Sequence, residues 1–340
     1  MKHSAYLRTA GFFICGALAQ VDVPPNFTVG VPWQIIIQNT LDVTRPLQPT
    51  NVTVWDLDLY HIARNPNTVE YLRTNNPGTI LVCYFNAGLA QDTDCDYDTK
   101  WRNSGLLGNI YDPEEPEFNN ERWVNIKNQT ARDWMKQRIT LANQLGCDGV
   151  DPDNIDGYLR DADGNNGTWW DLSQDDYVSF VTELATHAHS LTTSQSHTML
   201  IGQKNARELV GRLSGVLDFA VLEDCKRLRE PGEPAFCRDF QAYIATEKPV
   251  FSIEYPSTLG DPETGACNAR GVDDTEYHNS CDTIQDTAGF SPVLKIQGGD
   301  GELNNCTQYC TGMVPGTGVV VTATNPELDG IDCPPGATEY

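Results

Sequence analysis

Short runs of apolar and β-branched residues recur along the chain and alternate with longer, more polar segments. Most of the runs have the length of a β-strand, and they are largely apolar throughout. Such runs are typical of strands that are buried on both faces of a parallel sheet. Eight of them occupy residues 33–37, 52–58, 79–85, 149–151, 198–204, 216–223, 249–255 and 291–296.

Three of the intervening segments have helical periodicity. Residues 130–146 place apolar side chains three or four positions apart, and Gly146 marks the end of the predicted helix. Residues 173–191 begin with Ser173, a favourable N-cap, and carry acidic residues in the first turn. Residues 205–215 form the third predicted helix.

Eight strands that alternate with helices predict an α/β fold. Eight is the strand number of the (β/α)8 TIM barrel, and 340 residues lie within the size range of that fold. The alternative is an open, doubly wound sheet, which usually carries a Gly-rich phosphate loop, and the sequence contains no such motif. We therefore expect one TIM-barrel catalytic domain over residues 20–340, with a Cys-rich portion over about 260–340.

Residues 1–19 have the features of a secretory signal peptide. Lys2 and Arg8 precede a short apolar run, and residues 17–19 (Ala-Leu-Ala) have the A-x-A form of a signal-peptidase site. The run is short for a membrane span. We predict cleavage before Gln20 and a secreted, extracellular protein without a membrane partner. A retained N-terminal anchor is the alternative.

The cysteine count agrees with an oxidising compartment. Of eleven cysteines, Cys15 lies in the predicted signal, which leaves an even number and predicts up to five disulfides. No paired C-x-x-C or H-x-x-x-H set indicates a structural zinc site. N-glycosylation motifs begin at Asn26, Asn51, Asn128, Asn166 and Asn305. The crowded cysteines of the last third, which we expect to staple that region, are Cys267, Cys281, Cys306, Cys310 and Cys333.

The chain is strongly acidic, with a formal net charge of −24. This charge makes nucleic acids and anionic membrane surfaces poor partners, and it would attract a cationic ligand. The alternative is that the charge serves solubility alone.

Polar residues follow the ends of most predicted strands. The active site of a TIM barrel lies at the C-terminal ends of its strands, so these side chains are candidates for a shared site. Paired carboxylates suit glycoside hydrolysis, and the sequence contains no G-x-S-x-G nucleophile elbow. The strand-end residues are Asp56, Asp58, Asn86, Asp151, Asp153, Lys204, Asn205, Glu223, Asp224, Glu254, Tyr255 and Gln297.

Two segments allow a metal-binding interpretation. Residues 161–167 begin like a calcium loop, but Asn166 stands where glycine is needed and Leu172 where glutamate is needed. Asp151, Asp153 and Asp156 are the second candidate set, although a strand with an internal proline opposes a flexible cage. We expect neither a metal nor another cofactor.

The stretch "GCDGVDPDNIDGY" (146–158) resembles the central motif of the endo-α-1,4-polygalactosaminidase family. Weaker matches occur in the expected order over roughly residues 30–300. They are "WQIIIQNTLD" (33–42), "WDLD" (55–58), "VCYFNAG" (82–88), "IGQKN" (201–205), "DFAVLEDC" (218–225) and "PVFSIEY" (249–255). The segment after "YFNAG" departs from the family pattern, and Leu222 stands where members often have asparagine.

The resemblance implies a secreted TIM-barrel glycoside hydrolase that cleaves α-1,4-linked galactosamine polymers internally. Carried over by position, Asp153 is the expected nucleophile and Glu223 the expected general acid/base. Glu254 stays open as the alternative acid. A nucleophile implies retention of configuration, for which the two carboxyl groups stand about 5–5.5 Å apart.

The implied substrate accounts for the negative charge, because each free galactosamine unit carries an ammonium group. We expect a monomer that binds this cationic polysaccharide, with Lys204 paired to a carboxylate in the cleft beside Asn205. The alternative for the aromatic side chains is a place in the core. Other candidate contacts are Asp58, Asp151, Asp156 and Glu254 for ammonium or hydroxyl groups, and Tyr84, Tyr255, Trp33 and Trp55 for stacking.

Two other functions remain open from the sequence. The first is a non-catalytic barrel that binds amino-sugar polymers. The second is a hydrolase of a neutral α-galactoside or galactan.

Overall fold

The computed structural model describes residues 21–112, 120–159, 167–226, 236–283, 285–298, 303–312, 318–328 and 331–339. The predicted signal peptide and residues 161–166 of the calcium-like segment lie outside these ranges.

Eight parallel strands form the barrel, each hydrogen-bonded to the next in chain order. They are β1 (Trp33–Ile36), β2 (Val54–Asp58), β3 (Ile80–Asn86), β7 (Gly149–Asp153), β8 (Leu200–Lys204), β9 (Phe219–Glu223), β10 (Val250–Glu254) and β11 (Ser291–Leu294). The Trp33 indole donates to the Ser291 carbonyl at 2.8 Å, so the first and last strands meet. The TIM barrel and all eight predicted strands are confirmed.

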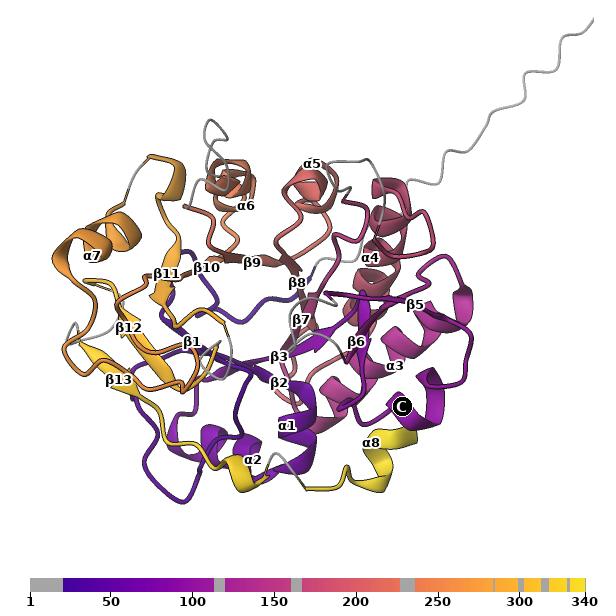
Figure 1. Ribbon diagram of the computed structural model, residues 1–340, viewed down its shortest axis with the longest axis horizontal. Coiled ribbons are helices and arrows are strands. Elements are labelled where there is room, and N and C mark those ends of the chain that lie inside the picture. The colour runs from indigo at the N-terminus through magenta and orange to yellow at the C-terminus, as the bar shows by residue number, and fades with distance from the viewer. Residues whose placement is uncertain are drawn as a thin grey trace, which may run out of the picture.

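The Cys-rich tail is part of the barrel wall. β12 (Cys306–Tyr309) and β13 (Val319–Val321) extend the sheet antiparallel from β11. Gln34 of β1 contacts Thr307 and Thr322 of this region through side-chain hydrogen bonds. In Figure 1 the yellow tail strands lie beside β1, over the seam of the barrel.

Helices surround the strands in Figure 1. They are α1 (Leu59–Arg64), α2 (Asn67–Asn75), α3 (Gln129–Leu145), α4 (Gln174–His189), α5 (Val210–Leu213), α6 (Gln241–Ile244), α7 (Asp274–Cys281) and α8 (Pro335–Glu339). Two predicted helices are confirmed with their ends. α3 stops at Gly146, whose φ of 96° suits glycine, and α4 begins with a capping box between Ser173 and Asp176. The third is shorter than expected, a 3-10 turn followed by α5.

A three-stranded antiparallel sheet, which the sequence analysis did not predict, follows β3. It consists of β4 (Leu89–Gln91), β5 (Leu107–Ile110) and β6 (Glu121–Val124). Ala87 and Gly88 donate backbone hydrogen bonds to the Asp153 carbonyl. A side chain on Gly88 would place its Cβ 1.8 Å from the Asn154 carbonyl oxygen. Glycine therefore lets this inserted sheet pack directly against the Asp-rich segment.

Aromatic side chains fill the barrel interior. The ring of Trp33 lies 4.8 Å from that of Phe251, and Phe219 meets Phe251 edge-on at 6.0 Å. Gly202 makes room for Phe219, because a Cβ there would lie 2.4 Å from the ring. The interior below the candidate site is thus a packed core, as in other TIM barrels.

The ten cysteines beyond the predicted signal form five disulfides, as the even count predicted. Two of them hold the tail together as expected, and Cys333 departs from that pattern by joining Cys95 of the inserted region. The pairs are Cys83–Cys147, Cys95–Cys333, Cys225–Cys237, Cys267–Cys306 and Cys281–Cys310. Within the described ranges, no helix is long and apolar enough to cross a membrane.

Candidate active site

A buried ammonium group lies at the centre of the strand ends. Lys204 is 1% exposed, and its Nζ is 3.0 Å from Asp153 Oδ2 and 3.5 Å from Glu223 Oε2. Burial works against the charged form of Lys204, but Asp153, Glu223 and Asp151 outweigh it and raise its pKa well above the usual value. The site therefore holds one lysine cation between two carboxyl groups.

The barrel brings these three residues together because each ends a neighbouring strand. Asp153, Lys204 and Glu223 are the last residues of β7, β8 and β9. Parallel neighbours in a barrel end at the same rim, so their last inward-pointing side chains converge. This is the arrangement that the strand-end pattern predicted.

Asp153 accepts hydrogen bonds from three donors. Besides Lys204, the Tyr84 hydroxyl donates to Oδ2 at 2.9 Å and the Asn154 backbone N–H donates to Oδ1 at 2.6 Å. Asn154 has a φ of 58°, which turns its amide back toward the carboxylate. These donors stabilise a negative charge on Asp153 and fix its orientation.

Glu223 is held differently. The Tyr255 hydroxyl donates to Oε1 at 2.7 Å, whereas Asn205 Nδ2 and Lys204 Nζ are 3.4 Å and 3.5 Å from Oε2. The Asn205 side-chain oxygen in turn accepts the Glu223 backbone N–H at 2.9 Å. One oxygen of Glu223 is thus tightly bonded and the other has only distant donors.

The contacts of Asp153 and Glu223 with Lys204 set an upper limit on the distance between the two carboxyl groups. Asp153 Oδ2 and Glu223 Oε2 are 3.0 Å and 3.5 Å from one nitrogen, so they lie within about 6.5 Å of each other. Retaining glycosidases place the pair about 5–5.5 Å apart, and inverting enzymes about 6.5–9.5 Å apart. The retaining distance lies within this upper limit.

Two further acids lie beneath this layer. Asp56 and Asp151 are at most 1% exposed, and none of their four carboxyl oxygens hydrogen-bonds to a described residue. Burial raises the pKa of Asp151 to about 7, with Lys204 opposing the rise and Asp153 and Glu223 adding to it. Burial and then the charge of Asp151 raise the pKa of Asp56 well above its usual value. The two acids therefore hold at least one proton near neutral pH.

The structure does not bring every predicted contact residue to the rim. Trp33 and Trp55 are core residues, 1% and 2% exposed. They therefore follow the alternative in which the aromatic side chains pack in the core instead of stacking on sugars. Asp58 caps α1, because its Oδ1 accepts the Tyr60 and His61 backbone N–H groups. Asp151 is fully buried beneath the rim and presents no surface to a sugar.

Glu254 lies on the other side of the barrel wall from Glu223. Ile253 is the register partner of Glu223, and successive strand residues point to opposite faces. Glu254 therefore points away from the barrel interior, whereas Tyr255 returns to it and reaches Glu223. Asp156, by contrast, is half-buried in the loop that follows β7.

Sequence analysis missed the residues that the inserted sheet adds. Tyr111 is 40% exposed and packs edge-on against Trp123 with ring centroids 5.5 Å apart. Burial, then the charges of Asp156, Asp153, Glu121 and Glu223, raise the pKa of Tyr111. No sequence motif singled it out, because the strands around it are short.

A second exposed ring lies on the loop before α4. Trp169 is 71% exposed and has a φ of 80°, a conformation that bulky residues rarely adopt. The loop is fixed to β5, since Asn109 Nδ2 donates to the Gly167 carbonyl at 2.9 Å. A Cβ on Gly108 would lie 2.1 Å from the Thr168 carbonyl oxygen, so this contact depends on glycine.

Among the described residues, one group of His, Cys, Asp and Glu side chains has the spacing of a metal site. It consists of Cys225, Cys237 and Glu254. The two sulfur atoms are joined in a disulfide, so they are not thiolate ligands. In the candidate set of Asp151, Asp153 and Asp156, the Asp153 carboxylate is already paired with Lys204.

The chain is similar to known glycoside hydrolases. The model of glycoside-hydrolase family GH114 matches residues 17–315. The crystal structure of Aspergillus fumigatus Ega3 in complex with galactosamine is 30% identical, with a TM-score of 0.67, and the match covers 87% of this chain and 100% of that one. The glycoside hydrolase domain of PelA from Pseudomonas aeruginosa shares the fold at 16% identity, with a TM-score of 0.50 and coverage of 80% and 96%. No curated protein sequence matches.

Proposed function

The chain belongs to glycoside-hydrolase family GH114 and is a glycoside hydrolase, and we propose that it cleaves α-1,4-linked galactosamine polymers internally, with retention of configuration. One observation carries the proposal: Lys204 lies between Asp153 and Glu223 at the C-terminal rim of the barrel. Two carboxyl groups at this spacing are the machinery that retaining glycosidases use.

In the first step, Asp153 attacks the anomeric carbon of the sugar whose bond is cut. Glu223 gives its proton to the departing glycosidic oxygen, and a glycosyl ester forms on Asp153. In the second step, Glu223 removes a proton from water, which attacks the anomeric carbon and releases Asp153 as a carboxylate.

The hydrogen bonds support this division of roles. Three close donors stabilise the negative charge that a nucleophile needs on Asp153. The Oε2 atom of Glu223 has only distant donors, which leaves it available to give a proton to the glycosidic oxygen and to take one from water. The position of Glu254 on the outer face of β10 supports Glu223 as the acid.

Lys204 has a positioning role and an electrostatic one. Its ammonium holds Asp153 in place before attack. Once the ester forms, Asp153 is neutral and the same ammonium is free to stabilise ionised Glu223 at 3.5 Å.

The proposed substrate fits the charge and the exposed rings. A formal net charge of −24 favours a polymer that carries an ammonium on each unit. Tyr111 and Trp169 offer aromatic faces for sugar rings along the rim, in the role that the sequence analysis gave to Trp33. Asp156 and Asn205 are the proposed polar contacts beside the catalytic pair.

The proposal includes secretion and a monomeric state. Five disulfides support an oxidising, extracellular compartment. The polymer is the one partner proposed, with no nucleic acid or membrane.

The test is mass spectrometry of products from de-N-acetylated galactosamine polymer, its N-acetylated form and a neutral galactan. We expect a ladder of galactosamine oligomers from the first polymer and little product from the galactan. Products from the galactan alone would support the neutral hydrolase. Binding to the polymer without any product would support the non-catalytic barrel.

A further inference from the structure

Gln203 is a fully buried polar side chain on the outer side of the barrel wall. It directly precedes Lys204 in β8, and the two side chains point to opposite faces of the strand. Lys204 points into the barrel between the catalytic carboxyl groups, so Gln203 lies behind the wall, where a substrate cannot touch it. The reaction proposed above makes no use of this amide.

The polar atoms of the Gln203 side chain all have partners. Its Nε2 donates to the carbonyl oxygens of Asn205 at 3.0 Å and Ala206 at 2.9 Å. Its Oε1 accepts the hydroxyl of Tyr243, a buried residue of α6, at 2.7 Å. Burial raises the pKa of Tyr243 well above its usual value, so this hydroxyl keeps its proton and donates it. The Gln203 amide is therefore fixed in one orientation, with its N–H groups toward the chain that follows β8.

The two carbonyls that Gln203 binds belong to a left-handed turn. The φ angle is 42° at Asn205 and 54° at Ala206, so two consecutive residues other than glycine adopt this conformation. It is unfavourable for residues with a side chain, because Cβ comes close to a carbonyl oxygen, and it persists only where surrounding contacts hold it. The hydrogen bonds from Gln203 are such contacts.

The turn directs the Asn205 side chain toward Glu223. Asn205 Oδ1 accepts the Glu223 backbone N–H at 2.9 Å, and Asn205 Nδ2 is 3.4 Å from Glu223 Oε2. The Asn205 backbone N–H donates to the Val221 carbonyl at 2.9 Å, which also ties the turn to β9. Asn205 thus contacts the acid/base at its backbone and at the oxygen that transfers the proton in the proposed reaction.

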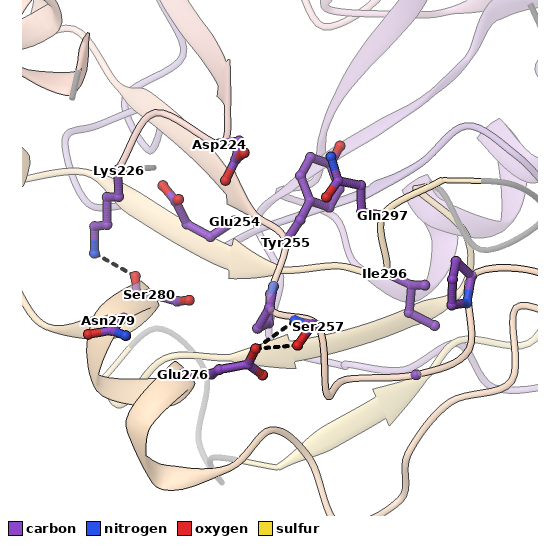
Figure 2. Close-up of a pocket in the computed structure, with 13 residues that line it drawn as sticks. Asp224, Lys226, Glu254, Tyr255, Ser257, Glu276, Asn279, Ser280, Ile296 and Gln297 are labelled. Atoms are coloured by element: carbon purple, nitrogen blue, oxygen red, sulfur yellow. Dashed lines mark hydrogen bonds between the residues drawn. The ribbon is translucent and has the colours of Figure 1, made fainter. Parts of the chain in front are cut away.

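Tyr255 holds the other oxygen of Glu223 from the opposite neighbouring strand. It directly follows β10, and its hydroxyl donates to Glu223 Oε1 at 2.7 Å. Figure 2 shows Tyr255 and Asp224, the residue after Glu223, among the side chains that line a pocket of about 810 Å³. On this side one hydroxyl fixes Glu223 directly, whereas on the β8 side the contact depends on the direction of the Asn205 side chain.

We propose that Gln203 is a positioning residue for the acid/base, because it holds the left-handed turn that aims Asn205 at Glu223. The inference rests on the proposed function. Without the Gln203 amide, the two carbonyls lose their donor and the turn loses contacts that hold it. Asn205 then no longer keeps its amide against Glu223 Oε2, and the acid loses its alignment with the departing oxygen.

The test compares the phenyl and the dinitrophenyl α-glycosides of one galactosamine oligomer. Phenoxide is a poor leaving group that needs a proton from the acid, whereas dinitrophenoxide leaves without one. The kcat/KM value reports the step that forms the ester. For Gln203→Leu we expect kcat/KM to fall about tenfold for the phenyl glycoside, the size of one hydrogen bond, and less than about twofold for the dinitrophenyl glycoside.

Gln34→Leu is the matched control. Gln34 is also fully buried with side-chain hydrogen bonds, but it lies on β1, with β10 and β11 between it and β9 around the barrel. Its replacement should lower stability as Gln203→Leu does, yet keep the wild-type ratio of the two kcat/KM values. For Gln203→Leu, an equal loss on both substrates, or no loss on either, would overturn the inference.

A milder variant keeps the proposal testable if Gln203→Leu does not fold. Tyr243→Phe removes one hydroxyl and keeps the ring in place, so it preserves the packing of α6 and frees the Gln203 amide to turn. We expect a selective loss of about threefold on the phenyl glycoside. An unchanged ratio of the two kcat/KM values in Tyr243→Phe would contradict a role for the fixed amide.

Asn205→Ala tests the route from Gln203 to Glu223. Asn205 is half-buried, and its replacement should lower kcat/KM for the phenyl glycoside selectively, by at least as much as Gln203→Leu. The double variant should lose no more than Asn205→Ala alone, because both changes act through one contact. Additive losses would overturn the inference. An equal loss on both substrates in Glu223→Gln would instead overturn the proposed function of Glu223 as the acid.

Discussion

Lys204 places its ammonium 3.0 Å from the Asp153 carboxylate, inside the barrel and almost out of contact with solvent. A lysine is seldom buried unless it is paired, and here the pair stands at the strand ends, where TIM barrels carry out chemistry. The contact orients Asp153 and leaves Lys204 within 3.5 Å of Glu223. It thereby links the two carboxyl groups on which the proposed reaction depends.

Replacement of either carboxyl group should abolish turnover and leave binding intact. For Asp153→Asn and Glu223→Gln we expect kcat to fall at least about 10³-fold, because each variant loses one covalent or proton-transfer step. Product release by mass spectrometry measures the loss, and polymer retention on the protein measures binding. Cleavage by both variants at the wild-type rate would disprove the assignment.

Lys204→Met should damage both activity and stability. The variant keeps the side-chain length but leaves the half-buried carboxyl groups of Asp153 and Glu223 without their cation. We expect kcat to fall about 100-fold and the free energy of unfolding to fall by about 3–5 kcal/mol. Denaturant unfolding and steady-state kinetics measure the two effects, and Lys204→Arg is the charge-conserving control. Unchanged kcat in Lys204→Met would remove this residue from the mechanism.

The buried pair Asp56 and Asp151 predicts a pH-dependent stability. Because the folded pKa of Asp151 is raised to about 7, its contribution is complete below the unfolded value of about 4 and is lost as pH rises through 7. Asp151→Asn mimics the protonated acid, so its stability should vary less between pH 4 and pH 8. The difference from wild type is at most about 4 kcal/mol. Urea unfolding at several pH values measures it, and parallel curves for both proteins would contradict the prediction.

Salt should weaken the cleavage of a cationic polymer. The Debye length falls from about 10 Å at 0.1 M to about 3 Å at 1 M, which screens the attraction between the acidic protein and ammonium groups. We expect KM for de-N-acetylated polymer to rise several-fold over this range. The N-acetylated polymer is the control and should show little change. An equal response of both polymers would show that the charge of the protein does not guide substrate binding.

The strand positions and the place of Asp153 and Glu223 at the strand ends were predictable because their signals are local. An apolar run followed by a polar residue marks a buried strand and its rim, and Asp153 and Glu223 both follow this rule. The side of the barrel wall to which each side chain points was not predictable. In a strand that is apolar on both sides, no alternation distinguishes inward from outward positions, so Glu254 was grouped with Tyr255.

The inserted sheet escaped prediction for a different reason. β4, β5 and β6 are three or four residues long, and β5 carries a mixture of apolar and polar residues. Backbone hydrogen bonds from Ala87 and Gly88 to the Asp153 carbonyl join this sheet to the end of β7, and no local sequence pattern encodes a contact between segments so far apart. Tyr111 was missed with them. Trp33 was predicted to stack on a sugar ring, because an aromatic residue on a strand has the same sequence pattern whether its side chain lies in the core or in a cleft.

The stereochemistry of the first product tests the central claim most directly. Proton NMR during the first minutes of cleavage records the anomer that the enzyme releases from an α-1,4-linked galactosamine polymer. If Asp153 forms a covalent intermediate beside Glu223, the first product carries the α-anomer, and the β-anomer appears only later by mutarotation. Release of the β-anomer first would show inversion and contradict the proposed roles of Asp153 and Glu223.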